Sequence, residues 1–154
     1  MKKTFCIALA LLVLLTACGL PAAPQPPVLR FQNTPVVLTQ GELVLRGRLD
    51  FTGTDGARLK LETPDPAAGG CFSLLGGVYS VTYGDVTLQA PANGCIYSFL
   101  RDLHRIGTQC GFVKKGLWGL TEHAEVLLAT DKNGTPLKLW NEKENWTAEF
   151  FEND

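Results

Sequence analysis

The 154-residue sequence predicts a mainly β (α+β) fold with about five strands and one helix. Two kinds of pattern predict it. In several segments apolar and polar residues alternate with a period of two, which is typical of half-buried strands. In one segment apolar residues recur every three or four positions, which is typical of a helix with one buried face. Turn-forming residues separate these segments, so we expect short elements joined by tight loops.

The clearest alternation covers residues 42–51. Turn-forming residues at 52–56 separate it from a second alternating segment at 58–62, and this order predicts a β-hairpin. The side of the first strand that we expect to be buried carries Leu43, Leu45, Gly47, Leu49 and Phe51.

Further short strands follow along the chain. Gly84 and Asp85 are expected to bend or split one of them. A turn at 131–134 predicts a second hairpin, and residues 142–154 form either a last strand or a covering tail. These further strands are expected at 71–75, 78–90, 124–130 and 136–140.

One helix is predicted between residues 95 and 106. Asn93 lies just upstream as a candidate N-cap, and Gly107 just downstream as a stop. The apolar face consists of Ile96, Phe99, Leu100, Leu103 and Ile106. The outward face is expected to carry Arg101, Asp102, His104 and Arg105.

The order of these elements from Val36 to about Asn141 resembles an OB-type barrel, in which a helix between the third and fourth strands plugs one end. The phrases LVLRGRL and ARLKLET contribute to this resemblance. It implies a small OB-like barrel or roll, with bacterial envelope OB-fold proteins as the nearest family. It carries no functional residue over to this chain.

The N-terminus has the layout of a secretory signal peptide: a positive segment at 1–4, an apolar run at 5–15 and small residues after it. The run would span roughly 16 Å as a helix, which is about half of a bilayer's hydrocarbon core. We therefore expect residues 1–17 to direct export and then to be removed.

Leu15, Thr16, Ala17 and Cys18 resemble the lipobox of bacterial lipoproteins at every position. The resemblance implies cleavage between Ala17 and Cys18, a diacylglyceryl thioether on the Cys18 sulfur and a further acyl chain, such as palmitate, on the freed amine. Membrane attachment through this lipid anchor would be stable. The alternative is ordinary cleavage after Ala17, to which the large side chain of Leu15 is poorly suited. Gly19, in place of an inner-membrane retention aspartate, favours the outer membrane facing the periplasm in a diderm host.

The chain then divides into a signal peptide at 1–17, a linker at 18–35 that begins with the lipidated cysteine, and a single globular β-rich domain at 36–154. Five of the nine prolines lie in the linker, so we expect it to be extended. The alternative is that residues 28–31 pack as an edge strand.

The mature protein is expected to be mildly acidic. Lys2 and Lys3 are the only charged residues of the signal, so its removal leaves 12 basic and 15 acidic side chains, a net charge of −3 (12 − 15). This balance argues against a nucleic-acid partner.

Three cysteines remain in the domain, and an oxidising compartment favours one disulfide between two of them. All three pairings of Cys71, Cys95 and Cys110 stay open. We favour Cys95 with Cys110 because they bracket the predicted helix and its return loop, which leaves Cys71 as a small buried apolar residue. No pattern around these cysteines is typical of a cysteine enzyme.

No familiar catalytic, nucleotide-binding or metal-binding motif occurs in the sequence. The two histidines, His104 and His123, fit none of the usual zinc spacings and are interpreted as a solvated helix residue and a strand-entry residue. We therefore predict no catalytic residues, no metal and no cofactor, and we expect the protein not to be an enzyme.

Two features are candidate partner-binding surfaces. Arg101, Arg105, Lys114 and Lys115 concentrate positive charge that is suited to anionic lipid, lipopolysaccharide or an acidic partner; the alternative is a solvated face. Trp118, with the other two tryptophans, offers an aromatic surface for a glycan or peptide; the alternative is core packing.

Three functions follow from these features, in order of preference. The first is a non-catalytic binding or interaction module anchored in the cell envelope, with an envelope protein, glycan or lipid as its partner. The second is a protective lipoprotein of the inhibitor, immunity or phage-exclusion type. The third is an uncharacterised envelope enzyme, for which the sequence offers neither nucleophile nor base.

Overall fold

A computed structural model of the chain describes residues 29–51, 53, 56–109, 112–114, 117–120 and 123–152. These residues form β-strands and one helix, which confirms the mainly β class. The elements are β1 (Phe31–Gln40), β2 (Leu43–Phe51), β3 (Ala57–Thr63), β4 (Cys71–Leu75), β5 (Val78–Tyr83), β6 (Val86–Gln89), α2 (Gly94–Thr108), β7 (Phe112–Lys114), β8 (Leu117–Leu120), β9 (His123–Thr130), β10 (Pro136–Asn141) and β11 (Trp146–Phe150).

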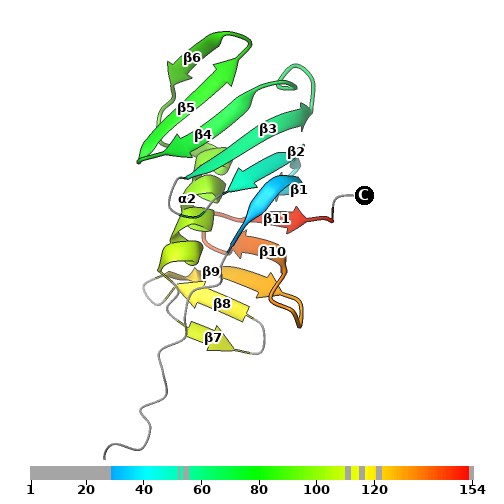
Figure 1. Cartoon of the computed structure of the whole chain (residues 1–154), viewed down its shortest axis with the longest axis vertical. Coiled ribbons are helices and arrows are strands. Elements are labelled where there is room, and N and C mark those ends of the chain that lie inside the picture. Colours follow the sequence, from blue (N-terminus) through cyan, green and yellow to red (C-terminus); the bar gives the residue numbers. More distant parts are fainter. Residues whose placement is uncertain are drawn as a thin grey trace, which may run out of the picture.

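The strands form a single open antiparallel sheet in the order β6-β5-β4-β3-β2-β1-β11-β10-β9-β8-β7. It consists of two meanders, β1 to β6 and β7 to β11, which are joined where β1 pairs with β11 (Figure 1). The predicted OB-like barrel or roll of about five strands is therefore wrong in both closure and strand number. Each meander continues outward from the centre, so β6 and β7 end as separate edges.

Both predicted hairpins are confirmed. β2 pairs with β3, and Leu45, Leu49 and Phe51 of β2 are buried as expected, whereas Leu43 at its start is 43% exposed. β9 pairs with β10 around the turn at Asp131, whose side chain accepts hydrogen bonds from the backbone N–H groups of Asn133 and Thr135. The strand predicted at 78–90 is split into β5 and β6 at residues 84–85, as expected.

The centre of the sheet comes from the two ends of the described chain. Leu29 and Phe31 are buried, so ordered packing extends into the segment expected to be linker. Val36 pairs with Phe150, which places β1 in the middle of the sheet and not at its edge. The last strand expected within 142–154 is β11.

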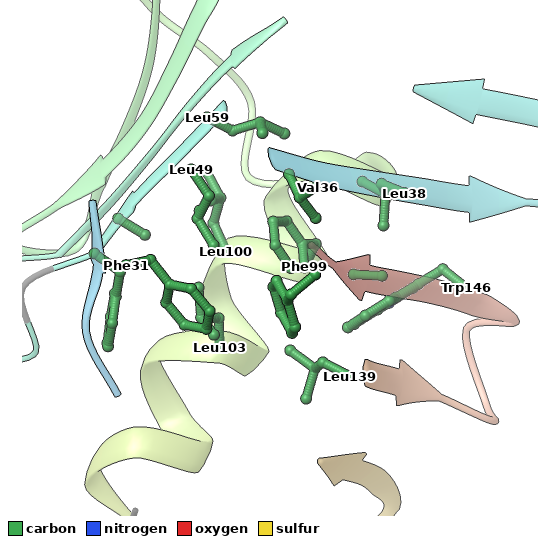
Figure 2. Packing of buried hydrophobic residues seen from close by; sticks show 14 of the residues in the cluster. Phe31, Val36, Leu38, Leu49, Leu59, Phe99, Leu100, Leu103, Leu139 and Trp146 are labelled. Carbon is green, nitrogen blue, oxygen red and sulfur yellow. The ribbon is translucent and has the colours of Figure 1, made fainter. Parts of the chain in front are cut away.

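Helix α2 crosses one face of the sheet and contacts β3, β4, β8, β9 and β11 (Figure 1). The side of α2 that faces the sheet carries four fully buried apolar residues, Phe99, Leu100, Leu103 and Ile106. Figure 2 shows Phe99 pointing toward Trp146, whose ring it meets edge-on at a centroid distance of 5.8 Å. This contact between helix and central strand makes α2 the second layer of the fold.

The ends of α2 differ from the prediction. Gly107 does not stop the helix, which continues to Thr108, where the hydroxyl donates a hydrogen bond to the His104 carbonyl at 2.9 Å. Gly107 instead lies close to Leu29, whose Cδ1 would be 3.4 Å from a Cβ added at residue 107. Asn93 occupies the N-cap position as expected, but its side chain makes no capping hydrogen bond.

A glycine before β3 gives the first test of this packing. Gly56 has φ of +110°, and an added Cβ would collide with the Leu74 carbonyl oxygen and lie 2.8 Å from Leu75 Cδ2. Gly56→Ala is expected to lower the free energy of unfolding by about 2 kcal/mol, measured by urea titration. Gly134→Ala is the control, because φ there is +86° and no atom lies within 4 Å. Equal losses at both positions would show that the collision contributes nothing.

Candidate functional site

Asp102 is completely buried, so its expected position on the outward face of the helix is wrong. The reason is helical geometry: residues 99, 102, 103 and 106 are three or four positions apart and share one face. A carboxylate buried in this way must be paired and hydrogen-bonded, and its partners define the polar part of the site.

Arg101 and Asn141 bind the two oxygens of Asp102. Arg101 donates from Nε to Oδ1 at 2.8 Å and from Nη2 to Oδ2 at 3.1 Å. Asn141, at the end of β10, donates from Nδ2 to Oδ2 at 2.8 Å. The hydrogen bond to Asp102, the strongest influence, raises the pKa of Arg101 above its ordinary value, although burial opposes this. Arg101 is therefore held in a fixed position and remains charged.

Glu144 extends this network to the turn between β10 and β11. Arg101 Nη2 also donates to Glu144 Oε1 at 2.8 Å. The Glu144 backbone N–H donates to Asn141 Oδ1 at 2.9 Å, and Gln40 Nε2 donates to the Glu144 carbonyl at 2.8 Å. The helix, the central strand β1 and this turn are thereby held together by polar contacts on the side of α2 that carries Arg101.

A cavity of about 340 Å³, called here the α2 pocket, lies between the outer side of the helix and the turn between β4 and β5. Tyr97 packs at the helix side, with its ring 5.7 Å from Arg101 Cζ and its edge toward the Tyr79 ring at 5.3 Å. The lining residues are Gly56, Leu74, Gly76, Gly77, Tyr97, Arg101, His104 and Arg105.

Arg105 differs from Arg101 in how its charge is compensated. Its Nη1 lies 4.0 Å from Asp102 Oδ1, which Arg101 already contacts at 2.8 Å. The distance of 4.0 Å is too long for a hydrogen bond, and the Arg105 guanidinium donates none to any residue that the structure describes. Its side chain is 25% exposed. A fork of N–H donors at the wall of a cavity is suited to a carboxylate or phosphate group.

The structure brings together only part of the predicted binding residues. Arg101 and Arg105 line the α2 pocket. Lys114 ends β7, where the structure describes the backbone alone, and Lys115 lies outside the described residues. Trp118, on β8, is partly buried and packs against the core, as is typical of a structural residue.

Sequence reasoning missed the roles of Tyr97, Asn141 and Glu144. Tyr97, four positions before Arg101, shares its helix face, so helical spacing alone was a signal for it. The contacts of Asn141 and Glu144 with α2 depend on how β10 and β11 lie against the helix, for which the local sequence gives no signal.

The cysteines are placed differently from the expectation. Cys71 and Cys95 are free thiols, and Cys110 lies outside the described residues, so the disulfide between Cys95 and Cys110 stays a prediction. The expected burial of Cys71 is wrong: it is partly exposed, because it lies opposite Lys60 on the outer face of the sheet. Cys95 is buried, and burial, followed by the negative charge of Glu144, raises its pKa to about 11. A protonated thiol at neutral pH is a poor nucleophile.

The residues that the structure describes contain no group of three or more His, Cys, Asp or Glu side chains arranged to hold a metal ion. They also contain no helix with the length and apolar character needed to cross a membrane.

Comparison with known proteins gave no relatives. The chain matches no protein-family model, no curated protein and no solved structure.

Glu144 makes the network sensitive to acid. Burial opposes its ionisation, but hydrogen bonds from Arg101 and Ser98 and nearby positive charges outweigh burial and lower its pKa below the ordinary 4.5. Because the folded-state pKa is below the unfolded value, ionised Glu144 stabilises the fold above pH 4.5, and this contribution disappears as the pH falls through the folded-state pKa.

Glu144→Gln is therefore expected to reduce the loss of unfolding free energy on acidification, measured by urea titrations over a series of pH values. Glu42→Gln is the control, because it removes an exposed carboxylate at the turn between β1 and β2, outside this network. The interpretation is wrong if both variants keep the acid sensitivity of the wild type.

Proposed function

We propose that the protein is a membrane-anchored envelope lipoprotein whose domain is a non-catalytic binding module. The anchor part of the proposal is supported by the signal peptide and by the lipobox at residues 15–18, which lie outside the described residues. The binding part is supported by the α2 pocket. Its single most important observation is the Arg105 guanidinium in the pocket wall, whose one ion-pair partner among the described residues, Asp102, lies 4.0 Å away and is already bonded to Arg101.

The pocket is suited to binding more than to catalysis. Nucleophilic catalysis needs a hydroxyl, thiol or carboxylate beside a base. Among the described lining residues His104 is the candidate base, and no serine, threonine, cysteine or acid accompanies it. Two arginines, a tyrosine and the adjacent glycine turn instead form a concave site in which a ligand can be oriented by a few polar contacts.

The ligand class that we propose is an anionic group, phosphate or carboxylate, borne by an envelope component. Arg101 supplies a charge held in place by Asp102 and Glu144, so it loses little side-chain freedom when a ligand binds. Arg105 supplies hydrogen-bond donors that no described residue uses. The ring of Tyr97 and the side chain of Leu74 offer apolar contact to the rest of the ligand.

Anion binding predicts a stabilisation that depends on Arg105. The mature chain in neutral detergent is heated with increasing inorganic phosphate, and separately with short-chain phosphatidylglycerol, to distinguish free phosphate from a lipid headgroup. When the anion is present at a hundred times its Kd, the free energy of unfolding of the wild type is expected to rise by about 2.7 kcal/mol, which is seen as a higher Tm. Arg105→Gln is expected to lose this gain.

Arg46→Gln serves as the matched control, because Arg46 is an exposed arginine of β2 that does not line the α2 pocket. It is expected to keep the full response to the anion. The proposal fails if neither probe stabilises the wild type, or if Arg46→Gln loses as much of the response as Arg105→Gln.

A further inference from the structure

The apolar side of the hairpin formed by β5 and β6 is not covered by the helix. Tyr83, Val86 and Leu88 are 60%, 60% and 61% exposed. Tyr83 pairs with Val86, and Val81 pairs with Leu88, so these side chains share the face that carries the buried Tyr79. That face is the one that α2 covers farther along the sheet, where Tyr79 meets Tyr97. Figure 1 shows the hairpin at the upper end of the sheet, beyond the helix.

β6 is also an edge strand, four residues long, that carries no lysine, proline or bulge to block pairing. All four of its residues, Val86 to Gln89, are exposed, and the strand contains no charge and no proline. Native edge strands are commonly blocked by lysine, proline, a bulge or a very short length. The opposite edge, β7, differs from β6 in that it ends at a lysine, Lys114.

We propose that β6 pairs with β6 of a second copy of this chain, antiparallel and around a twofold axis, to form one continuous sheet. Side chains directly opposite each other in antiparallel strands share a face. With Thr87 opposite Thr87 of the second copy, Val86 comes opposite Leu88, and the two exposed apolar faces form one stripe. A shift of one residue would place Leu88 opposite Thr87 and separate the apolar faces.

The charges and the backbone groups of β6 are compatible with pairing to a second copy of the chain. In the proposed register Asp85 lies opposite Gln89, so no like charges face each other. A lipid surface would cover the apolar side chains but leave the N–H and C=O groups of the edge without hydrogen-bond partners, which is unfavourable in hydrocarbon. A second strand satisfies both requirements, and a twofold contact uses the same patch on both copies.

Cross-linking tests the register. Thr87→Cys in the full chain is expected to give a disulfide-linked dimer under mild oxidation. Thr82→Cys is the matched control, because Thr82 pairs with Thr87 and bonds to its hydroxyl at 2.9 Å, but lies one strand farther from the edge. Wild type measures the background from the native cysteines. Cross-linking of Thr82→Cys to the same extent as Thr87→Cys would overturn the register.

Sedimentation of the detergent-solubilised mature chain tests the association itself. The wild type is expected at about twice the mass of the protomer, and Leu88→Lys at the protomer mass. Leu137→Lys, which adds the same charge at a 49% exposed leucine of β10, is expected to remain dimeric. A monomeric wild type, or dissociation by both lysine variants, would overturn the proposal. None of these results depends on anion binding in the α2 pocket.

Discussion

Replacement of Asp102 by alanine is expected to lower the free energy of unfolding by about 3 kcal/mol. Asp102 is fully buried, and it accepts hydrogen bonds from Arg101 and from Asn141. Its removal leaves the buried Asn141 amide without this partner and Arg101 without one of its two carboxylate partners. The estimate is at the lower end of the range for broken buried pairs, because Arg101 is 30% exposed and keeps its contact with Glu144.

Urea titration of Asp102→Ala and of a comparison variant, Glu144→Ala, measures the loss of unfolding free energy at each position. Glu144 is 34% exposed and bonds to the same arginine, so its loss is expected to cost less, about 1 kcal/mol or below. Equal destabilisation by the two substitutions would mean that burial of Asp102 does not determine the strength of the network.

Replacement of Cys18 by alanine is expected to abolish lipid labelling and to release the protein from membranes. In the proposed lipidation, a thioether to the diacylglyceryl group would form on a cysteine sulfur, and Cys18 is the residue that matches the lipobox. One acyl chain alone binds membranes only marginally, so loss of the diacylglyceryl group removes most of the attachment energy. Fractionation of cells that express the variant, with labelling by a fatty-acid analogue, measures both effects.

Cys71→Ala is the control for this experiment, because Cys71 is a partly exposed free thiol on the sheet. It is expected to keep both the label and the membrane association. Continued membrane association of Cys18→Ala would contradict the anchor, and an exported, unlabelled wild type would favour ordinary cleavage after Ala17.

The buried network and the α2 pocket are two sides of the same helix. Asp102 faces the core, and Arg101 and Arg105 lie on the same side of the helix as each other and reach the pocket wall. Loss of Asp102 therefore leaves Glu144 as the remaining carboxylate that positions Arg101, and it also weakens the fold. Anion binding by a folded Asp102→Asn variant, compared with the wild type, separates the positioning of Arg101 from global stability.

Residue periodicity and turn residues were enough to predict several local elements of this protein, but not β1, β7 or β8. The hairpins β2–β3 and β9–β10, the split between β5 and β6, and helix α2 were all predicted from residue periodicity and turn residues. These features depend on neighbours within a few positions, so a short window of sequence contains the information. Strands β7 and β8 were missed because each has only three or four residues, too few for an alternation to be recognised.

Which surface each element packs against became clear from the three-dimensional structure. Val36 and Phe150 lie near opposite ends of the domain sequence, and their pairing joins the two meanders at the centre of the sheet. The outer strands β6 and β7 are left as edges, so the sheet is open where a closed barrel was predicted. Asp102 shows the same limit within the helix: its charge suggested solvent, but the Asn141 amide from a distant strand allows its burial. Periodicity shows which side of an element is buried, whereas the partner of that side depends on long-range packing, which no local pattern encodes.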